Sequence, residues 1–152
     1  KNYDESINTL RDVSHDHLLK FGKHLDRVAY MRCKYVIMEN ERVEKASQAL
    51  NSNNLKLFGE LLNQSHKGLA DYYEVSCDEL NFLVNVSNES GQVLGSRMMG
   101  GGFGGCTINI VAESNCDFVV STILNSYKKK FGFDAQSYFV QIEDGCRLMD
   151  YN

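Results

Sequence analysis

The sequence lacks both the positive charge and the long apolar runs that two classes of protein need. Its 16 lysines and arginines stand against 20 aspartates and glutamates, which gives a formal net charge of -4. A surface that follows a nucleic-acid backbone is strongly basic instead. No apolar run approaches the length that crosses a bilayer. We therefore expect neither nucleic acid nor a membrane as a partner.

The chain also lacks paired cysteines and metal-binding spacings. Its five cysteines are odd in number, scattered, and never in a C-x-x-C pair. This argues against a disulfide framework and against a zinc site. Each cysteine is instead expected to be a small buried side chain in a reduced, cytoplasmic protein. The four histidines show no H-x-x-x-H spacing with a nearby carboxylate, so we expect no bound metal.

The first residue is Lys1 and not methionine, and the opening residues are polar. This start favours a piece of a longer protein. The length of 152 residues fits a single domain, residues 1–152, that is long enough for one hydrophobic core.

Helical periodicity dominates the first two thirds of the chain. No proline occurs anywhere, and no glycine interrupts residues 25–50. Apolar residues recurring every three or four positions predict helices over residues 8–21, 25–50, 55–72, 77–88 and 114–131. On the second of these, Glu39, Glu41 and Glu44 are expected to form a solvated face. Ser76 and Glu79 have the spacing of a capping box that starts the helix over residues 77–88.

The periodicity changes after residue 92. Alternating apolar residues predict strands over residues 93–98, 106–111 and 138–142, with one more short strand over 146–149. Helices followed by β-β-α-β predict an α+β sandwich, in which helices cover a small antiparallel sheet.

A glycine-rich stretch joins the first two predicted strands. Six of the twelve glycines lie within residues 94–106. Glycine is used where the backbone needs a positive φ or where another group approaches it closely. Gly100, Gly102 and Gly105 formally satisfy G-x-G-x-x-G, but a strand follows where a dinucleotide fingerprint needs a helix, and no Gly-Lys-Ser/Thr is present. The loop either presents its backbone to a phosphate or a phosphate-binding segment, or forms a tight hairpin against a neighbour.

Few other residues have side chains suited to catalysis or ligand binding. Arg97, on the strand that enters the loop, can hold a phosphate or carboxylate bidentately, or serve as a structural ion-pair partner. No nucleophile, general base or metal cage can be assembled from the remaining residues. Any catalysis that this chain serves has most of its reacting groups elsewhere.

Residues 95–107, GSRMMGGGFGGCT, resemble the third signature motif of the GHMP sugar and isoprenoid kinases, in the form found in galactokinases. Three more segments agree in the expected order. They are residues 10–13, residues 32–43, which resemble the RRARHVVTENERV helix, and residues 63–80, which resemble the N-x-S-H and DDYEVSCPEL stretch. The resemblance covers nearly the whole chain and is to the C-terminal domain of the galactokinase family.

The resemblance implies a two-domain kinase that transfers the γ-phosphoryl group of ATP, with Mg²⁺, to the 1-hydroxyl of galactose. In that family the sugar-binding segment, the phosphate loop and the catalytic carboxylate belong to the N-terminal domain. None of these lies in this chain, so we expect no catalytic residue here, no ATP or Mg²⁺ bound to this piece, and no activity of the piece alone. Its partner is then that domain, with sugar and ATP in the intact protein.

The resemblance also implies a fold and a site. The family's C-terminal domain is a ferredoxin-like α/β sandwich, and its third motif supports the phosphate site. That support role falls on the loop and on the strand before it. The residues concerned are Gly100, Gly101, Gly102, Phe103, Gly104, Gly105 and Arg97.

Some positions depart from the family pattern. Met99 stands where the motif usually carries threonine, and Tyr72, Asp78 and Asn81 replace Asp, Pro and Asp. The missing hydroxyl at Met99 keeps a second interpretation open, that of a galactokinase-like sensor or regulatory protein without turnover. A related kinase for N-acetylgalactosamine or arabinose is also compatible with the motif.

Overall fold

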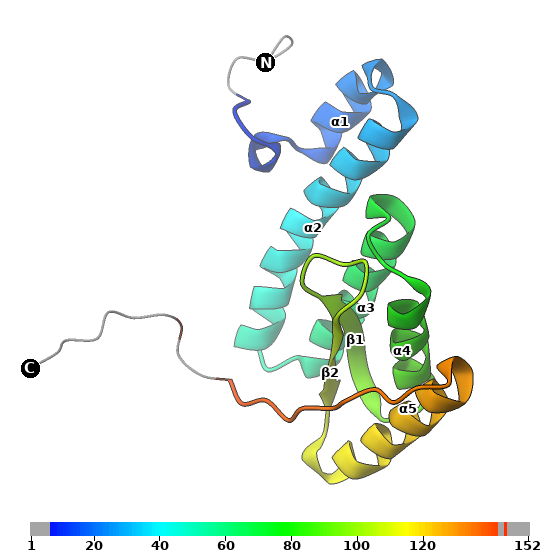
Figure 1. The fold of residues 1–152 in the computed structure, drawn as a ribbon. Helices are drawn as coiled ribbons and strands as arrows, with labels where there is room; N and C mark the ends of the chain where they lie inside the picture. Colours follow the sequence, from blue (N-terminus) through cyan, green and yellow to red (C-terminus); the bar gives the residue numbers. More distant parts are fainter. Residues whose placement is uncertain (1–6, 143–144, 146–152) are drawn as a thin grey trace, which may run out of the picture.

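A computed structural model describes residues 7–142 and residue 145. Within these residues, five α-helices and two strands follow one another in the order α1, α2, α3, α4, β1, β2 and α5 (Figure 1). The elements are α1 (His15–Phe21), α2 (Arg27–Asn51), α3 (Leu55–Gly68), α4 (Asp78–Glu89), β1 (Val93–Met99), β2 (Cys106–Val111) and α5 (Cys116–Phe131).

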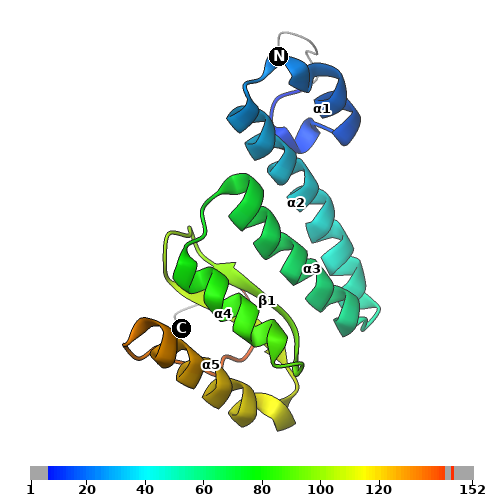
Figure 2. The ribbon, with the colours of Figure 1, turned by 90° about the vertical axis from the view of Figure 1, so that its right-hand side faces the viewer.

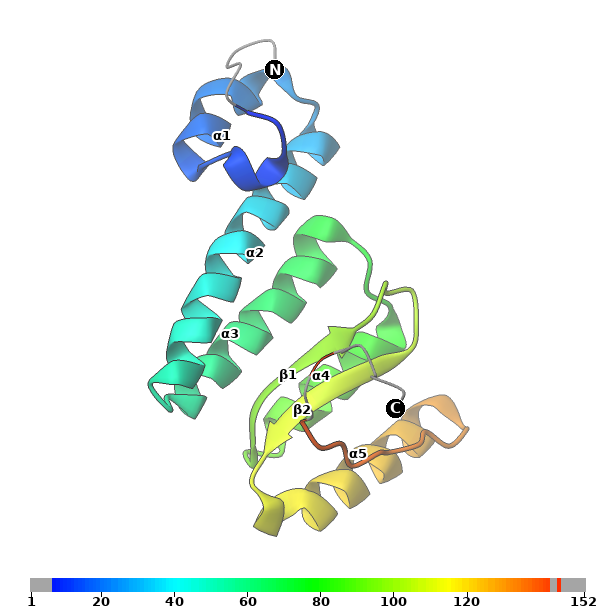
Figure 3. The same ribbon diagram turned by 90° about the vertical axis from the view of Figure 1, so that its left-hand side faces the viewer.

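Two of the helices, α3 and α4, cover one face of the β-hairpin. α3 and α4 pack against β1, α2 packs on α3, and α5 lies beside α4 (Figure 2). The opposite face of the hairpin is turned to the viewer in Figure 3. The strands pair antiparallel, with Gly95 opposite Ile110 and Met99 opposite Cys106. This confirms the predicted α+β architecture of a small antiparallel sheet with helices packed on it.

The hydrophobic core lies where α2, α4 and β1 meet the end of α3. Its buried residues are Tyr35, Leu69, Leu80 and Met98. α3 approaches β1 closely because both elements carry a glycine at the contact, Gly59 and Gly95. The absence of two side chains lets helix and strand backbones touch.

Most predicted boundaries hold within a few residues, for local reasons. The first predicted helix is divided, since Ser14 caps α1 through the backbone N–H of His17. α2 ends at Asn51, and the Asn54 side chain then caps α3 by accepting from the N–H of Leu57. α5 ends at Phe131 and is capped by Gly132, which takes a left-handed conformation with φ of 85°.

Two predictions about α2 and α4 are wrong. The capping box at Ser76 is not formed: Cys77 is the N-cap residue of α4, and the Ser76 hydroxyl donates to Asn81 Oδ1 at 2.7 Å. Glu39 is not part of a solvated face, because α3 and β1 lie over that part of α2 and bring Ser65 and Arg97 to its carboxylate.

The prediction of a strand over residues 138–142 is also wrong. The sheet that the described residues form contains β1 and β2 alone. The side chains of Tyr138, Phe139 and Val140 are 71 to 74% exposed. A strand needs a partner backbone to satisfy its hydrogen bonds, and alternation by itself supplies none. The strand predicted over residues 146–149 lies outside the described residues.

Candidate functional site

The glycine-rich loop, residues 100–105, is a tight connection between β1 and β2. Its backbone takes positive φ at Gly100 (87°), Gly102 (89°), Gly104 (136°) and Gly105 (99°), and also at Phe103 (61°). Such values are strained for residues that carry a Cβ, so the run of glycines follows from the path of the backbone.

One side of this loop is attached to the segment between α3 and α4. The Phe103 N–H donates to the carbonyl oxygen of Val75 at 2.7 Å. A Cβ on Gly102 would lie 2.1 Å from the same oxygen, so no side chain fits there. The loop therefore makes the close backbone contact that the sequence predicts, and its partner within this chain is Val75.

The other side of the loop is open. A Cβ built on Gly100, Gly101 or Gly104 would meet no atom within 4 Å, and the Phe103 side chain is 76% exposed. The loop thus has an attached side and a free side, and the free side can receive a ligand or another part of a longer protein.

A cavity of about 260 Å³ adjoins the loop. Its lining residues come from the start of α4, from the loop and from α5. They are Cys77, Glu79, Leu80, Leu83, Phe103, Gly104, Gly105 and Tyr127. Burial, together with the nearby Glu79 carboxylate, raises the pKa of the Tyr127 phenol. A phenol is protonated at neutral pH even without this upward shift, so the hydroxyl has a hydrogen to donate.

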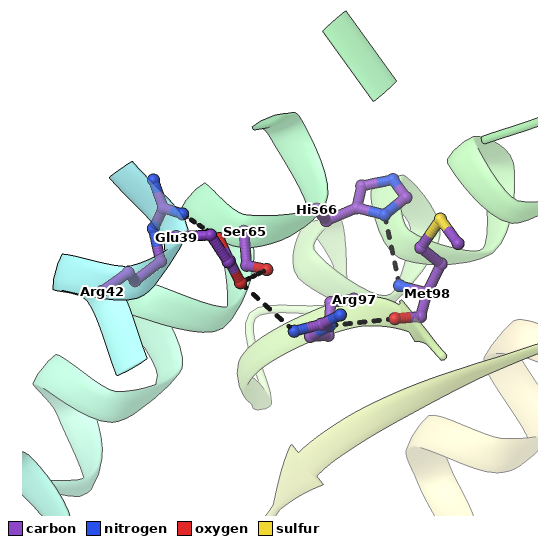
Figure 4. Close-up of polar contacts among 6 residues, drawn as sticks. All are labelled: Glu39, Arg42, Ser65, His66, Arg97 and Met98. Atoms are coloured by element: carbon purple, nitrogen blue, oxygen red, sulfur yellow. Dashed lines mark hydrogen bonds and ion pairs between the residues drawn. The ribbon is translucent and has the colours of Figure 1, made fainter. Parts of the chain in front are cut away.

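Arg97 takes part in a polar cluster that joins α2, α3 and β1 (Figure 4). Its Nη1 lies 3.6 Å from Glu39 Oε1, and its Nε donates to the carbonyl oxygen of Met98 at 2.9 Å. Glu39 also accepts from Ser65 Oγ at 2.5 Å and pairs with the buried Arg42. Of the two roles considered for Arg97, the structure shows the ion pair, and a phosphate role stays a prediction.

Two side chains of α3 hold the free edge of β1. Asn63 Oδ1 accepts from the Ser96 N–H at 2.8 Å. His66 Nδ1 accepts from the Met98 N–H at 3.2 Å (Figure 4). The spacing of three residues puts both on one face of the helix. That spacing was visible in the sequence, but only the packing of α3 on β1 shows what it is for.

His66 is held neutral by this arrangement. It is 6% exposed, and burial lowers its pKa, with the Asn81 side chain opposing the shift and Arg97 adding to it. A neutral ring can accept at Nδ1, whereas a charged ring cannot. The Met98 N–H, just before the loop, depends on that acceptor.

The described residues offer no metal cage. Within residues 7–142 and 145, no group of three or more His, Cys, Asp or Glu side chains comes together to hold an ion. In the same part of the chain no helix is long and apolar enough to cross a membrane. Four cysteines there are free: Cys33, Cys77, Cys106 and Cys116.

Comparison with known proteins identifies the class. Residues 46–126 match the family model described as GHMP kinases C terminal. The chain therefore belongs to the GHMP kinase C-terminal family.

The similar proteins then narrow the family. A galactokinase of Clostridium acetobutylicum is 45% identical over 125 residues, which are 82% of this chain and 32% of the relative. One of Clostridium beijerinckii is 40% identical over 94% of this chain and 37% of its own length. The chain thus spans about a third of the length of the curated relatives it matches. The resemblance to the C-terminal domain of a galactokinase is confirmed.

Solved structures agree. The Lactococcus lactis galactokinase complexed with galactose superposes with a TM-score of 0.86 and 36% identity, over 91% of this chain and 36% of that one. The mevalonate kinase of L. major in complex with R-mevalonate gives a TM-score of 0.53 at 24% identity, over 79% of this chain and 35% of that one. This second likeness shows a shared fold only.

Proposed function

We propose that this chain is the C-terminal part of a kinase that transfers the γ-phosphoryl group of ATP to the 1-hydroxyl of galactose. The observation that carries the proposal is the glycine loop, whose attached side is seated on Val75 and whose other side is open. The galactokinase relatives support the reaction class and the sugar. A cytoplasmic location belongs to the same proposal and is supported by the free cysteines.

In this proposal the loop supports the phosphate site and supplies no reacting atom. Phosphoryl transfer depends mostly on positioning and charge stabilisation. A rigid loop that positions the phosphates therefore affects the rate without contributing a reacting group. Gly100, Gly101 and Gly104 face open space, which fits the approach of phosphates or of the segment that holds them. In the intact protein ATP would supply the phosphoryl group, and Mg²⁺, held by residues outside this chain, would neutralise the charge of the phosphates.

The test compares this chain with the longer protein that contains it. We expect ATP-dependent phosphorylation of galactose by the longer protein and none by residues 1–152 alone. Turnover by the pure chain would overturn the assignment of the catalytic groups to another part. Parallel assays with N-acetylgalactosamine and arabinose identify the preferred sugar.

A second candidate is a sensor that binds sugar and nucleotide without turnover. Met99 favours it, because this side chain is 52% exposed at the end of β1, beside the loop, where a threonine hydroxyl is usual in the family motif. The longer protein would then bind ATP and galactose, for example by calorimetry, and show no product. Galactose 1-phosphate formed at the rate of a metabolic enzyme would exclude this candidate.

A further inference from the structure

Arg32 of α2 holds the segment on which the glycine loop is seated. Its Nη1 donates to the carbonyl oxygen of Tyr72, and its Nη2 donates to Glu74 Oε2 at 2.5 Å. The guanidinium also lies over the ring of Tyr73, 5.8 Å from the centroid. A single side chain thus contacts three consecutive residues that are about forty positions away in the sequence.

The segment it holds is irregular and needs support from outside. Leu69–Tyr73 forms a π-helical turn, and Glu74 follows in the left-handed conformation with φ of 56°. π-turns and left-handed residues other than glycine cost backbone energy and persist only where the surroundings stabilise them. Arg32 bonds to both parts, the end of the π-turn and the left-handed residue.

Val75 comes directly after this segment. Its N–H donates back to Leu69, and its carbonyl oxygen accepts from the Phe103 N–H at 2.7 Å. Because Gly102 also touches that oxygen, a shift of the Val75 carbonyl moves the attached side of the loop. Arg32 is therefore connected to the loop through Tyr72, Glu74 and Val75.

We propose that Arg32 is a positioning residue for the phosphate-site loop, acting through the backbone of residues 72–75. This proposal rests on the proposed function, because it assigns the loop to the ATP site. The Arg32 side chain is 29% exposed, and its hydrogen bonds go to Tyr72 and Glu74, which precede Val75, and not to the loop itself. It acts by fixing the position of residues 72–75, on which the loop rests, and not by contacting phosphate.

The shape of the guanidinium matters more than its charge. Glu74 is 58% exposed, so the ion pair taken alone is a weak surface interaction. The two bonds together require a planar fork whose donors point in fixed directions, and a lysine ammonium cannot reproduce this at both acceptors. Arg32→Lys and Arg32→Gln therefore both release the segment, although only the second removes the charge.

The experiment uses the longer protein, with the wild type and Arg32→Lys, Arg32→Gln and Lys45→Gln. Lys45 is exposed on the same helix and serves as the charge-removal control. We expect both Arg32 variants to lower kcat/KM for ATP by roughly 10- to 100-fold, mainly through KM, since misplacement distant from the chemistry has effects of this size. KM for galactose should change much less.

A second readout separates positioning from simple loss of stability. Amide hydrogen exchange at Phe103 should become faster in both Arg32 variants at temperatures well below unfolding, while exchange in α5 stays unchanged. A wild type without kinase activity would refute the proposed function. Unchanged ATP kinetics and unchanged Phe103 exchange in folded Arg32 variants would overturn the role of Arg32. A variant that loses stability with no faster exchange at Phe103 would equally overturn it.

Discussion

Gly59 of α3 and Gly95 of β1 touch backbone to backbone. A Cβ on Gly59 would lie 2.1 Å from the carbonyl oxygen of Leu94, and one on Gly95 would lie 2.2 Å from the carbonyl oxygen of Gly59. This contact sets how deeply the helix sits on the strand that leads into the glycine loop. It therefore affects both the stability of the fold and the position of the site.

Gly59→Ala should destabilise the protein although alanine is the better helix former. The gain in helix propensity is about 1 kcal/mol, whereas overpacking against a backbone that cannot move aside costs up to about 3 kcal/mol. We expect a net loss of about 2 kcal/mol in the free energy of unfolding, measured by urea denaturation. Gly101→Ala, where a Cβ meets open space, is the matched control. Equal stability of the two variants would show that the helix can move away.

Gly102→Val should impair ATP use in the longer protein. The new side chain would collide with the Val75 carbonyl, and the φ of 89° is strained for valine. We expect kcat/KM for ATP to fall by roughly 10-fold or more, measured by steady-state kinetics. Gly104 has a φ of 136° and no atom close to an added Cβ. Gly104→Val should therefore have a similar effect, solely because valine strains the backbone conformation of the loop. Lys45→Gln, at an exposed position of α2, should leave the kinetics near wild type. Normal kinetics of a folded Gly102→Val protein would make the loop purely structural.

Stability should fall below neutral pH because of His66. Its pKa is lowered from 6.5 in the folded protein by burial, so the unfolded chain takes up the proton more readily. The stability that neutral His66 contributes is fully present above about pH 6.5. It decreases as the pH falls below that value, because protonation then favours the unfolded state. The urea midpoint is expected to be lower at pH 5.5 than at pH 7.5.

The control for this pH effect is His66→Gln, whose amide oxygen can still accept from the Met98 N–H. That variant should show a flatter pH dependence than the wild type. His15→Gln, at an exposed position of α1, should retain the full dependence. If His15→Gln and His66→Gln behaved alike, another group would be responsible for the slope.

Glu39→Gln should be far more destabilising than a surface substitution. It removes the negative charge shared by Arg42, which is 8% exposed, and Arg97. Loss of one partner of a buried pair costs about 3–5 kcal/mol, and partial exposure of Arg97 reduces this to roughly 2–3 kcal/mol. Glu41→Gln, exposed on the same helix, should change stability by less than about 0.5 kcal/mol. If urea denaturation gave similar free energies of unfolding for the two variants, the stabilising role of the polar cluster around Glu39 would be refuted.

Much of the fold could be predicted from the sequence. The strand over residues 106–111 is found with both of its predicted limits, and α2 and α5 begin and end within two residues of prediction. These features depend on neighbouring residues: apolar periodicity, side-chain caps and glycine at a helix end. The glycine loop was visible for the same reason, because positive φ restricts the residue type directly.

Only the tertiary structure decided which of these local patterns are buried, paired or free. Glu39 was predicted to be solvated, but α3 and β1 partly cover its carboxylate. Residues 138–142 alternate as a strand does, and the sheet of the described residues does not include them. The contact of Gly102 with Val75, and of Arg32 with residues 72–74, joins positions 27 to 42 apart in the chain. Local periodicity contains no information about such distances. By itself the sequence determined most of the helices and strands, the loop and the family, whereas packing determined what the loop rests on and which side chains hold it there.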